Sequence, residues 1–518
     1  MRTKPIGFMV AALMVLCGAP SSRAATLDGT VKVGGIVLDE EGDRSAVQET
    51  YDVYDGFAVS QVRLDGRFDA GNSFRLDLRD INLDSRQGEF VYRIPRRFKL
   101  SAGYDQNRQV FDPARAVNSE RKDLKFAADF TAGEWFGVSG SYGRLTRTGD
   151  RLAFPAGSAS VLGTSYDNAL TLGQVTVRGQ KGRRGGAVTY QMSDYDDDLS
   201  ASAGRKGRVV SARLYTPCFF YDKLTHLLRG AYGVREITDG ELDYSFANFQ
   251  YTGVVQPVTA WQVRYNFEAN RVDNESNQLK TDRFQNILDV THYYSRGRIT
   301  AGYGYELNDD DRSLTRYSSW RAGATYRHGS RVGVKLDYAG RVKNDDEDLT
   351  LLKDVEASRI RASLDLRPVD RFSFGGGYTK RERELPDIDV TVDGDVATGY
   401  GRYEIPSWGS LGADYTYSND AYRDLAGNFD TESHIVTGRA ELTRLKKLRL
   451  AGGVTYLDIG KDLDIEKSAM FVEGAYKLLR GYSLEVRYNV YNYDDYILLD
   501  RYYTANVVRI NLVYDLKH

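Results

Sequence analysis

The most constraining feature of this chain is a regular alternation of short and long links between segments with strand-like patterns. The short links hold two to seven residues of turn chemistry, as in Ile94-Pro95-Arg96, Ser295-Arg296-Gly297 and Arg367-Pro368-Val369-Asp370. The long links between them are polar and rich in Asp, Asn and Gly. This alternation is typical of outer-membrane β-barrels, which have tight turns at the periplasmic end and longer loops outside the cell.

Within the segments, apolar and polar side chains alternate with the period of a β-strand. Residues 261–268 read Trp-Gln-Val-Arg-Tyr-Asn-Phe-Glu, and residues 360–367 read Ile-Arg-Ala-Ser-Leu-Asp-Leu-Arg. Because charged side chains are costly in lipid, the polar face of each strand must look inward. We therefore expect Arg264, Glu268, Arg361 and Asp365 to face the lumen and to contact a partner inside it.

Counting the segments gives an even number, which places both chain ends at the periplasmic end. We predict an all-β fold, a transmembrane antiparallel up-and-down barrel of about 26 strands, or 24 if the weak strands 29–38 and 88–94 are lost. The predicted strands are 29–38, 57–69, 72–80, 88–94, 97–106, 122–131, 134–144, 168–179, 184–195, 207–217, 224–236, 243–252, 257–271, 283–294, 298–308, 316–328, 330–342, 356–367, 370–382, 394–405, 408–419, 432–444, 447–460, 467–478, 481–494 and 500–515.

The chain divides into a signal peptide and one domain. Arg2 and Lys4 precede an apolar stretch at 6–16, and Ser22-Arg23-Ala24 offers small residues for cleavage, so we expect residues 1–24 to be a signal peptide. Residues 25–518 contain no linker or low-complexity tract and are predicted to be a single barrel, integral to the bacterial outer membrane. Its surroundings would be lipid and lipopolysaccharide, and the net charge of -2 argues against nucleic acid as a partner.

The size of the barrel limits what it can do. Barrels of 16 to 18 strands already leave an aqueous channel, and the diameter grows roughly linearly with strand number. The sequence shows no plug domain before the first strands and no link much longer than about 23 residues. A wall of about 26 strands would leak unless something filled it, so we expect a separate protein in the lumen.

Two segments resemble a known family. Residues 88–93, Gly-Glu-Phe-Val-Tyr-Arg, and 98–106, Phe-Lys-Leu-Ser-Ala-Gly-Tyr-Asp-Gln, followed by Val-Phe-Asp-Pro-Ala-Arg at 110–115, are similar to the MtrB/PioB family of outer-membrane porins. The resemblance implies a sheath around a periplasmic multihaem c-type cytochrome. That cytochrome would pass electrons across the outer membrane to or from an extracellular cytochrome, a metal oxide or another acceptor. Some members carry an N-terminal Cys-x-x-Cys pair, which the mature chain lacks.

The sequence gives this chain no haem of its own. Covalent c-type attachment needs Cys-x-x-Cys-His, and the only cysteines are Cys17 and Cys218. We therefore expect no cofactor bound covalently here, with haem carried by the partner. The five histidines are scattered, so we expect no metal site, no convergent catalytic residues and no enzymatic activity.

Charged clusters mark the two ends of the predicted barrel. The long links hold acidic groups that could bridge to lipopolysaccharide or dock a partner: Asp194 with Asp196 to Asp198, Asp309 to Asp311, and Asp345 to Asp348. The short turns are basic and could contact lipid phosphates or steer an acidic partner to the mouth: Arg96 and Arg97, Lys181, Arg183 and Arg184, and Lys446 and Lys447.

An alternative function also fits the pattern. A general or substrate-specific diffusion porin would have a loop folded inward as a constriction. The segment from Gly149 to Asn168 is the best candidate for such a loop. A sheath would instead have a wide lumen and loops turned outward.

Overall fold

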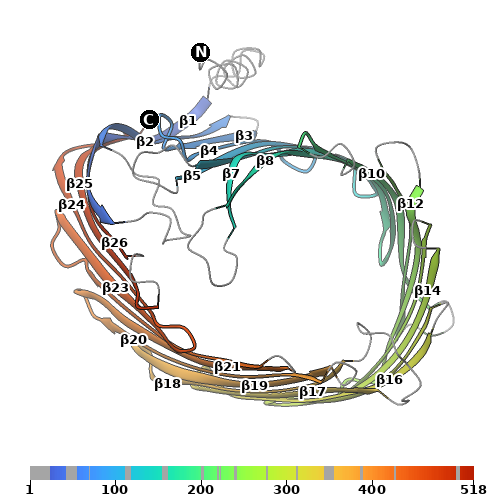
Figure 1. The fold of residues 1–518 in the computed structure, drawn as a ribbon. Coiled ribbons are helices and arrows are strands. Elements are labelled where there is room, and N and C mark those ends of the chain that lie inside the picture. The colour runs from blue at the N-terminus through green and yellow to red at the C-terminus, as the bar shows by residue number, and fades with distance from the viewer. Residues whose placement is uncertain are drawn as a thin grey trace.

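The computed structural model describes residues 24–42, 55–68, 71–110, 118–153, 162–199, 204–218, 221, 223–237, 242–275, 278–310, 313–343, 355–385, 389–424, 427–497 and 502–517. They form one sheet of 26 strands that closes on itself (Figure 1). The strands are β1 (Ala24–Gly42), β2 (Gly56–Phe68), β3 (Ser73–Arg79), β4 (Arg86–Ile94), β5 (Phe98–Val110), β6 (Asn118–Ala132), β7 (Phe136–Ala153), β8 (Leu162–Lys181), β9 (Arg184–Asp197), β10 (Arg205–Pro217), β11 (Leu224–Ile237), β12 (Leu242–Val258), β13 (Trp261–Asn274), β14 (Leu279–Tyr294), β15 (Gly297–Asp310), β16 (Ser313–His328), β17 (Val332–Lys343), β18 (Glu356–Val369), β19 (Phe372–Leu385), β20 (Val390–Ile405), β21 (Gly409–Asp424), β22 (Gly427–Leu442), β23 (Leu448–Lys461), β24 (Ile465–Leu479), β25 (Tyr482–Asp495) and β26 (Tyr502–Lys517).

The sheet closes where the first strand meets the last. Every strand pairs antiparallel with its neighbour in sequence, and β1 pairs with β26 from Asp28 opposite Lys517 to Gly42 opposite Tyr503. Hydrocarbon offers no water to satisfy backbone groups, so a sheet in a membrane must have no free edge. Within the described ranges, no helix has the length and apolarity that a bilayer crossing needs. The predicted 26-strand up-and-down barrel is confirmed, including the two weak strands, which are β1 and β4.

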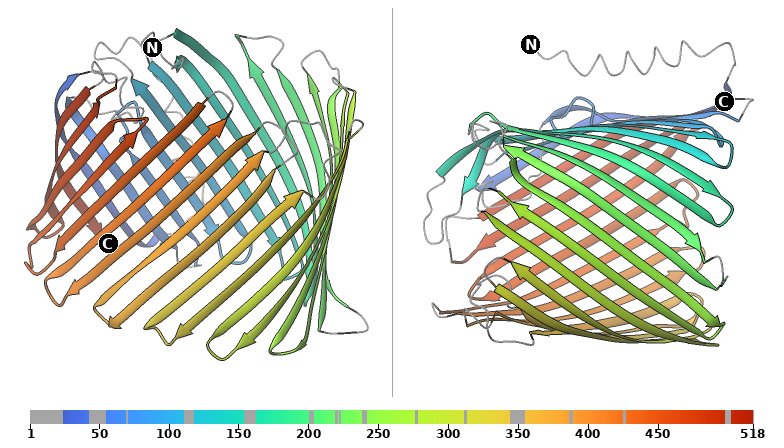
Figure 2. Two further views of the ribbon diagram at one scale, coloured as in Figure 1. Left: turned by 60° about the horizontal axis from the view of Figure 1, so that its bottom comes forward. Right: turned by 90° about the vertical axis from the view of Figure 1, so that its right-hand side faces the viewer.

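Most strands extend beyond the predicted bounds at the end with the longer links. For example, β7 continues to Ala153, whereas its predicted end is residue 144. The strands run obliquely around the wall (Figure 2). A tilted strand of about 9 to 11 residues already crosses the hydrocarbon. Beyond that depth both faces of the sheet meet water, so the apolar alternation that revealed the strands stops before the strands do.

The two faces of the wall can be assigned from the strand register. Tyr265, Leu288, Tyr303 and Trp320 lie directly opposite one another on β13 to β16. Directly paired residues point to the same face of a sheet, and these four side chains are 39%, 48%, 55% and 37% exposed. Large apolar side chains so exposed belong on the lipid face. The residues that alternate with them therefore face the lumen.

Tryptophans mark the membrane boundary at the end with the short turns, which is the periplasmic end of such barrels. Trp135 lies in the link between β6 and β7, Trp408 lies between β20 and β21, and Trp261 is the first residue of β13. All three are exposed, and basic groups lie over two of them: Lys181 Nζ is 5.1 Å from the Trp135 ring centroid, and the Arg444 guanidinium is 3.8 Å from that of Trp408. Aromatic girdles of this kind hold a barrel at the lipid headgroups.

The short hairpin of β3 and β4 packs its link, residues 80–85, against the inner face beside the closing seam. Val37 is 61% exposed on the outer face of β1, so its neighbour Ile36 points inward. Asp80 forms an ion pair of 3.3 Å with Arg509 on β26. Burial raises the pKa of Asp80, and the Arg509 guanidinium opposes this effect. The link completes a buried apolar cluster made of Ile36, Ala58, Leu83 and Val507.

Closure of the seam depends on a glycine. A Cβ on Gly34 would lie 1.8 Å from the backbone oxygen of Ile510 on β26, whereas a Cβ on Gly35 would have only the Gly56 oxygen nearby, at 3.8 Å. We expect Gly34→Ala to destabilise the closed barrel by roughly 1–3 kcal/mol, because the seam must open to admit the methyl group. The measurement is the temperature at which the folded form is lost in heat-dependent gel mobility. Gly35→Ala is the control, and an equal loss in both variants would contradict the role of the seam.

Candidate functional site in the barrel lumen

The four residues predicted to face the lumen all lie on the inner face. Arg264 and Glu268 are on β13. Arg264 is one position before the outward-facing Tyr265 and Glu268 is three positions after it, so both point to the opposite face. Arg361 and Asp365 are on β18, where the neighbouring Ile360 is 41% exposed on the outer face. The strand register is therefore consistent with a lumen-facing position for all four. Their contact with a partner stays a prediction.

The structure brings two of the four together. Arg264 and Arg361 line the same depression of about 400 Å³ in the inner wall, which extends from β13 to β18. Glu268 and Asp365 do not line it. The charged side chains of this depression include Arg264, Asp289, Arg298, Arg321, Arg359 and Arg361. The depression is thus a predominantly basic surface open to the lumen.

The two predicted acidic residues already have partners in the wall. Glu268 accepts hydrogen bonds from the Asn270 side chain at 2.6 Å and from the Asn248 side chain at 3.4 Å. Asp365 accepts one from the Tyr400 hydroxyl at 2.6 Å. Their carboxylates are therefore partly satisfied by neighbouring strands. Of the four residues, the two arginines are the better placed to bind something else.

At the edge of the same depression, an ion pair joins two strands across the strand between them, which has a glycine at that level. Arg321 on β16 donates to Asp289 on β14 through two nitrogens, with Nε 2.5 Å from Oδ1. Between them on β15 is Gly302, which is directly opposite both residues. A Cβ at Gly302 would lie 2.2 Å from Asp289 Oδ1 and 3.0 Å from Arg321 Cγ. The missing side chain is what lets the two charges meet.

The same arrangement recurs farther around the wall. Arg381 on β19 donates to Asp420 on β21 at 2.6 Å, and Gly394 on β20 is directly opposite both. A Cβ at Gly394 would lie 2.4 Å from Arg381 Nε and 2.6 Å from Asp420 Oδ1. We call these two units glycine-bridged ion pairs. Sequence analysis missed both, because they depend on the register of three strands.

A carboxylate at the centre of a polar network is also absent from the sequence predictions. The Glu306 side chain on β15 is 7% exposed. It accepts hydrogen bonds from Arg283 at 3.1 Å, Arg341 at 3.0 Å, Gln285 at 3.2 Å and Asn308 at 3.0 Å. The network joins the inner faces of β14, β15 and β17. It leaves Glu306 no free oxygen with which to receive a ligand.

The predicted acidic clusters are in part strand rather than loop. Asp194, Asp196 and Asp197 belong to β9, and Asp309 and Asp310 belong to β15. Asp194 already lies within the predicted strand 184–195, but the prediction of the other four as link residues was wrong, because the strands continue beyond the lipid-facing part of the wall. Asp311 and residues 345–348 lie outside the described residues. Among the residues that the structure describes, no group of three or more His, Cys, Asp or Glu side chains could hold a metal ion.

The remaining predicted features have simple environments. The His226 ring lies 2.9 Å from the Tyr251 hydroxyl, and the His434 ring lies 2.9 Å from that of Tyr415. Cys218 donates its backbone N–H to the Leu224 oxygen, at the link between β10 and β11. In the segment proposed as a constriction loop, the flanks belong to β7 and β8, and residues 154–161 lie outside the described residues. The basic turn residues are exposed at the periplasmic end: Arg96, Arg97, Lys181, Arg183, Arg184, Lys446 and Lys447.

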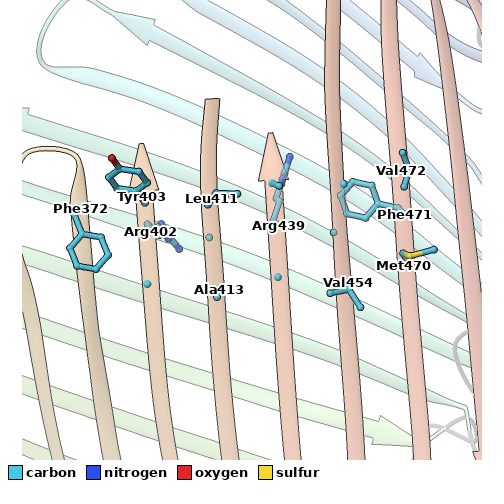
Figure 3. A pocket seen from close by; sticks show the side chains of 16 residues that line it. Phe372, Arg402, Tyr403, Leu411, Ala413, Arg439, Val454, Met470, Phe471 and Val472 are labelled. Atoms are coloured by element: carbon cyan, nitrogen blue, oxygen red, sulfur yellow. The ribbon is translucent and has the colours of Figure 1, made fainter. Parts of the chain in front are cut away.

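A second depression, of about 640 Å³, lies in the wall over β19 to β24 (Figure 3). Small residues, among them Gly401, Ala413 and Gly438, lie between larger apolar side chains such as Tyr403 and Val454. Tyr403 is 43% exposed and Val454 is 47% exposed, as expected of residues on the lipid face. The groove is therefore a part of the lipid-facing surface and is separate from the lumen.

Comparison with known proteins supports the fold. No family model matches the chain, so the resemblance to the MtrB/PioB family has no support from one, and no curated protein matches. Two variants of the FrpB iron transporter from Neisseria meningitidis are similar in structure. One has a TM-score of 0.53 and 9% sequence identity, and the match covers 98% of this chain and 83% of that one. The other has a TM-score of 0.52 and 7% identity, and the match covers 94% of this chain and 82% of that one. The siderophore receptor PirA from Pseudomonas aeruginosa gives 0.49 at 11% over 96% and 81%. At such low identity the two FrpB structures show the fold alone, that of a large outer-membrane β-barrel.

The glycine-bridged ion pair at Gly302 can be tested by adding one methyl group. We expect Gly302→Ala to lower the free energy of unfolding of the barrel by roughly 1–3 kcal/mol, because the Cβ displaces the Arg321 and Asp289 side chains. Loss of heat-dependent gel mobility measures the effect. Gly401→Ala is the matched control, since a Cβ there would meet nothing within 4 Å. Equal stability of the two variants would contradict this role of Gly302.

Proposed function

We propose that this barrel is an outer-membrane sheath that houses a periplasmic multihaem c-type cytochrome and so enables electron transfer across the membrane. An extracellular cytochrome or mineral would exchange electrons with the enclosed protein. The chain itself catalyses no reaction in this proposal. It supplies an insulating wall and a polar lining.

The observation that carries the proposal is the closed wall of 26 strands with a charged inner face. A barrel of this strand number is wider than the 16- to 18-stranded barrels that already conduct water and ions. The lining consists of paired and unpaired charges, as at Glu306 and Arg264, which suits contact with a hydrated protein surface. The family resemblance of residues 88–115 supports a haem protein as the occupant.

The direct test is to purify the tagged barrel from native membranes in mild detergent and to stain the denatured sample for covalent haem. We expect a haem-positive partner of a different mass, because this chain has no Cys-x-x-Cys-His site. A tagged unrelated barrel from the same cells is the control. Colourless, partner-free barrels from respiring cells would overturn the sheath and favour the diffusion porin.

Retention of the partner should depend on the predicted lumen residues. We expect the combined change of Arg264, Glu268, Arg361 and Asp365 to Ala to lower the haem recovered per barrel several-fold, while the amount of folded barrel stays the same. The control changes a cation and an anion on the outer face, Lys380 and Glu382, to Ala, because they have the same alternation as the outward-facing Tyr378. Unchanged recovery in the lumen variant would contradict the assignment of these side chains.

A further inference from the structure

Six arginines on one arc of the inner wall have no partner among the described residues. Arg213 on β10 and Arg229 on β11 are directly opposite each other in the ladder, and both are exposed. Neither forms an ion pair or a side-chain hydrogen bond with another described residue. Their neighbours Leu214 and Leu228 are also paired and form an outer row, with Leu214 47% exposed, so the two guanidinium groups face the lumen.

The other four arginines gather in the depression between β13 and β18. Arg264, Arg298, Arg359 and Arg361 are all exposed and all line it. Within the described part of the chain, none of the four makes a side-chain hydrogen bond or an ion pair. Together with Arg213 and Arg229 they form what we call the arginine arc, which follows the wall from β10 to β18.

The carboxylates nearby do not balance these charges. In the same depression, Asp289 is taken by Arg321, and Asp337 lies 2.6 Å from Lys335 Nζ. Glu268 and Asp365 are hydrogen-bonded to uncharged side chains and keep their charge, but two carboxylates cannot balance six arginines. The arc therefore presents a surplus of positive charge to the lumen.

The opposite side of the barrel is different. On β22 to β26 and β1, several lumen-facing cations are paired within the wall: Lys32 pairs with Glu485 at 2.8 Å, and Arg449 pairs with Glu441 at 2.8 Å. Arg439 on β22 makes no side-chain hydrogen bond or ion pair with a described residue. Figure 1 shows β10 to β16 and β23 to β26 on opposite sides of the lumen. The formal net charge of -2 hides this asymmetry, because acidic residues such as Asp198 and Asp309 lie elsewhere.

An external anion would stabilise the arc. Like charges directly opposite in a sheet are destabilising, so Arg213 and Arg229 gain from a counter-charge. Guanidinium groups bind carboxylates in bidentate geometry, which lysines cannot reproduce. Neighbouring strands are about 4.8 Å apart, so the arc from β10 to β18 covers roughly 40 Å of wall. That is far wider than one small anion.

We propose that the arginine arc is the docking face for a carboxylate-rich surface of the protein housed in the lumen. The inference rests on the proposed sheath function and adds the chemistry and the side of the contact. The enclosed protein presents acidic groups toward β10 to β18. On the opposite side it meets a wall in which more of the cations are paired, and this difference favours one rotational position in the barrel.

The test uses the purified full-length barrel in planar lipid bilayers, with poly-L-glutamate as a carboxylate-bearing probe. We expect it to block the current at a concentration at least tenfold below that of poly-L-lysine. Changing Arg264, Arg298, Arg359 and Arg361 to Gln should raise the blocking concentration of poly-L-glutamate at least tenfold. The same four positions changed to Lys keep the charge but lose the bidentate geometry, so this variant should lose less of the block than the Gln variant, and its remaining block shows that a fourfold variant folds and conducts.

Three outcomes would overturn the docking face. The first is an equal block of the current by poly-L-lysine. The second is an equal block by inorganic phosphate at the same total charge, which would indicate a small-anion site. The third is an equal loss of the poly-L-glutamate block when Arg96, Arg97, Lys446 and Lys447 are changed to Gln, which would place the block at the periplasmic mouth. Copurification of a haem protein tests the sheath independently. A haem partner without a block by poly-L-glutamate overturns only the arc, and a block without a haem partner overturns only the sheath.

Discussion

The whole structure depends on one constraint, the need for every backbone N–H and C=O to find a partner where no water is present. A sheet meets that need only when its last strand returns to its first, so the pairing of β1 with β26 determines everything else. Once the sheet is closed, its strand number sets the width of the lumen. Closure also reverses the usual arrangement of a folded protein, because large apolar residues such as Tyr303 lie outside and ion pairs lie inside.

This reversal explains which parts of the fold the sequence could predict. The period of two, combined with the cost of charge in lipid, identified all 26 strands and the inward direction of Arg264 and Arg361. Strand ends were harder, because β7 and β9 continue into water where both faces are polar. Partners across strands could not be predicted at all. Asp289 and Arg321 are 32 residues apart, and only the register of β14, β15 and β16 brings them together.

The charge balance of the lumen differs from that of the whole chain. The formal net charge of -2 is the sum over the lining, the turns and the loops, and these meet different surroundings. Inside the barrel, carboxylates such as Glu306 are engaged with several donors, while Arg213 and Arg229 have no such neighbour among the described residues. A lining that engages most of its carboxylates with donors of the wall and leaves guanidinium groups available is suited to an anionic guest. It is poorly suited to a guest that is rich in Lys and Arg.

The glycine-bridged ion pairs have a consequence for how such a wall can change over time. Asp289, Gly302 and Arg321 form a unit in which each member is useful only beside the other two, and Arg381, Gly394 and Asp420 form another. A mutation at the glycine separates the two charges, and a mutation at either charge leaves the other without its partner. The three positions should therefore be inherited together or replaced together. In an alignment of related barrels, that linked variation would mark the register of three adjacent strands, even where the sequences share little else.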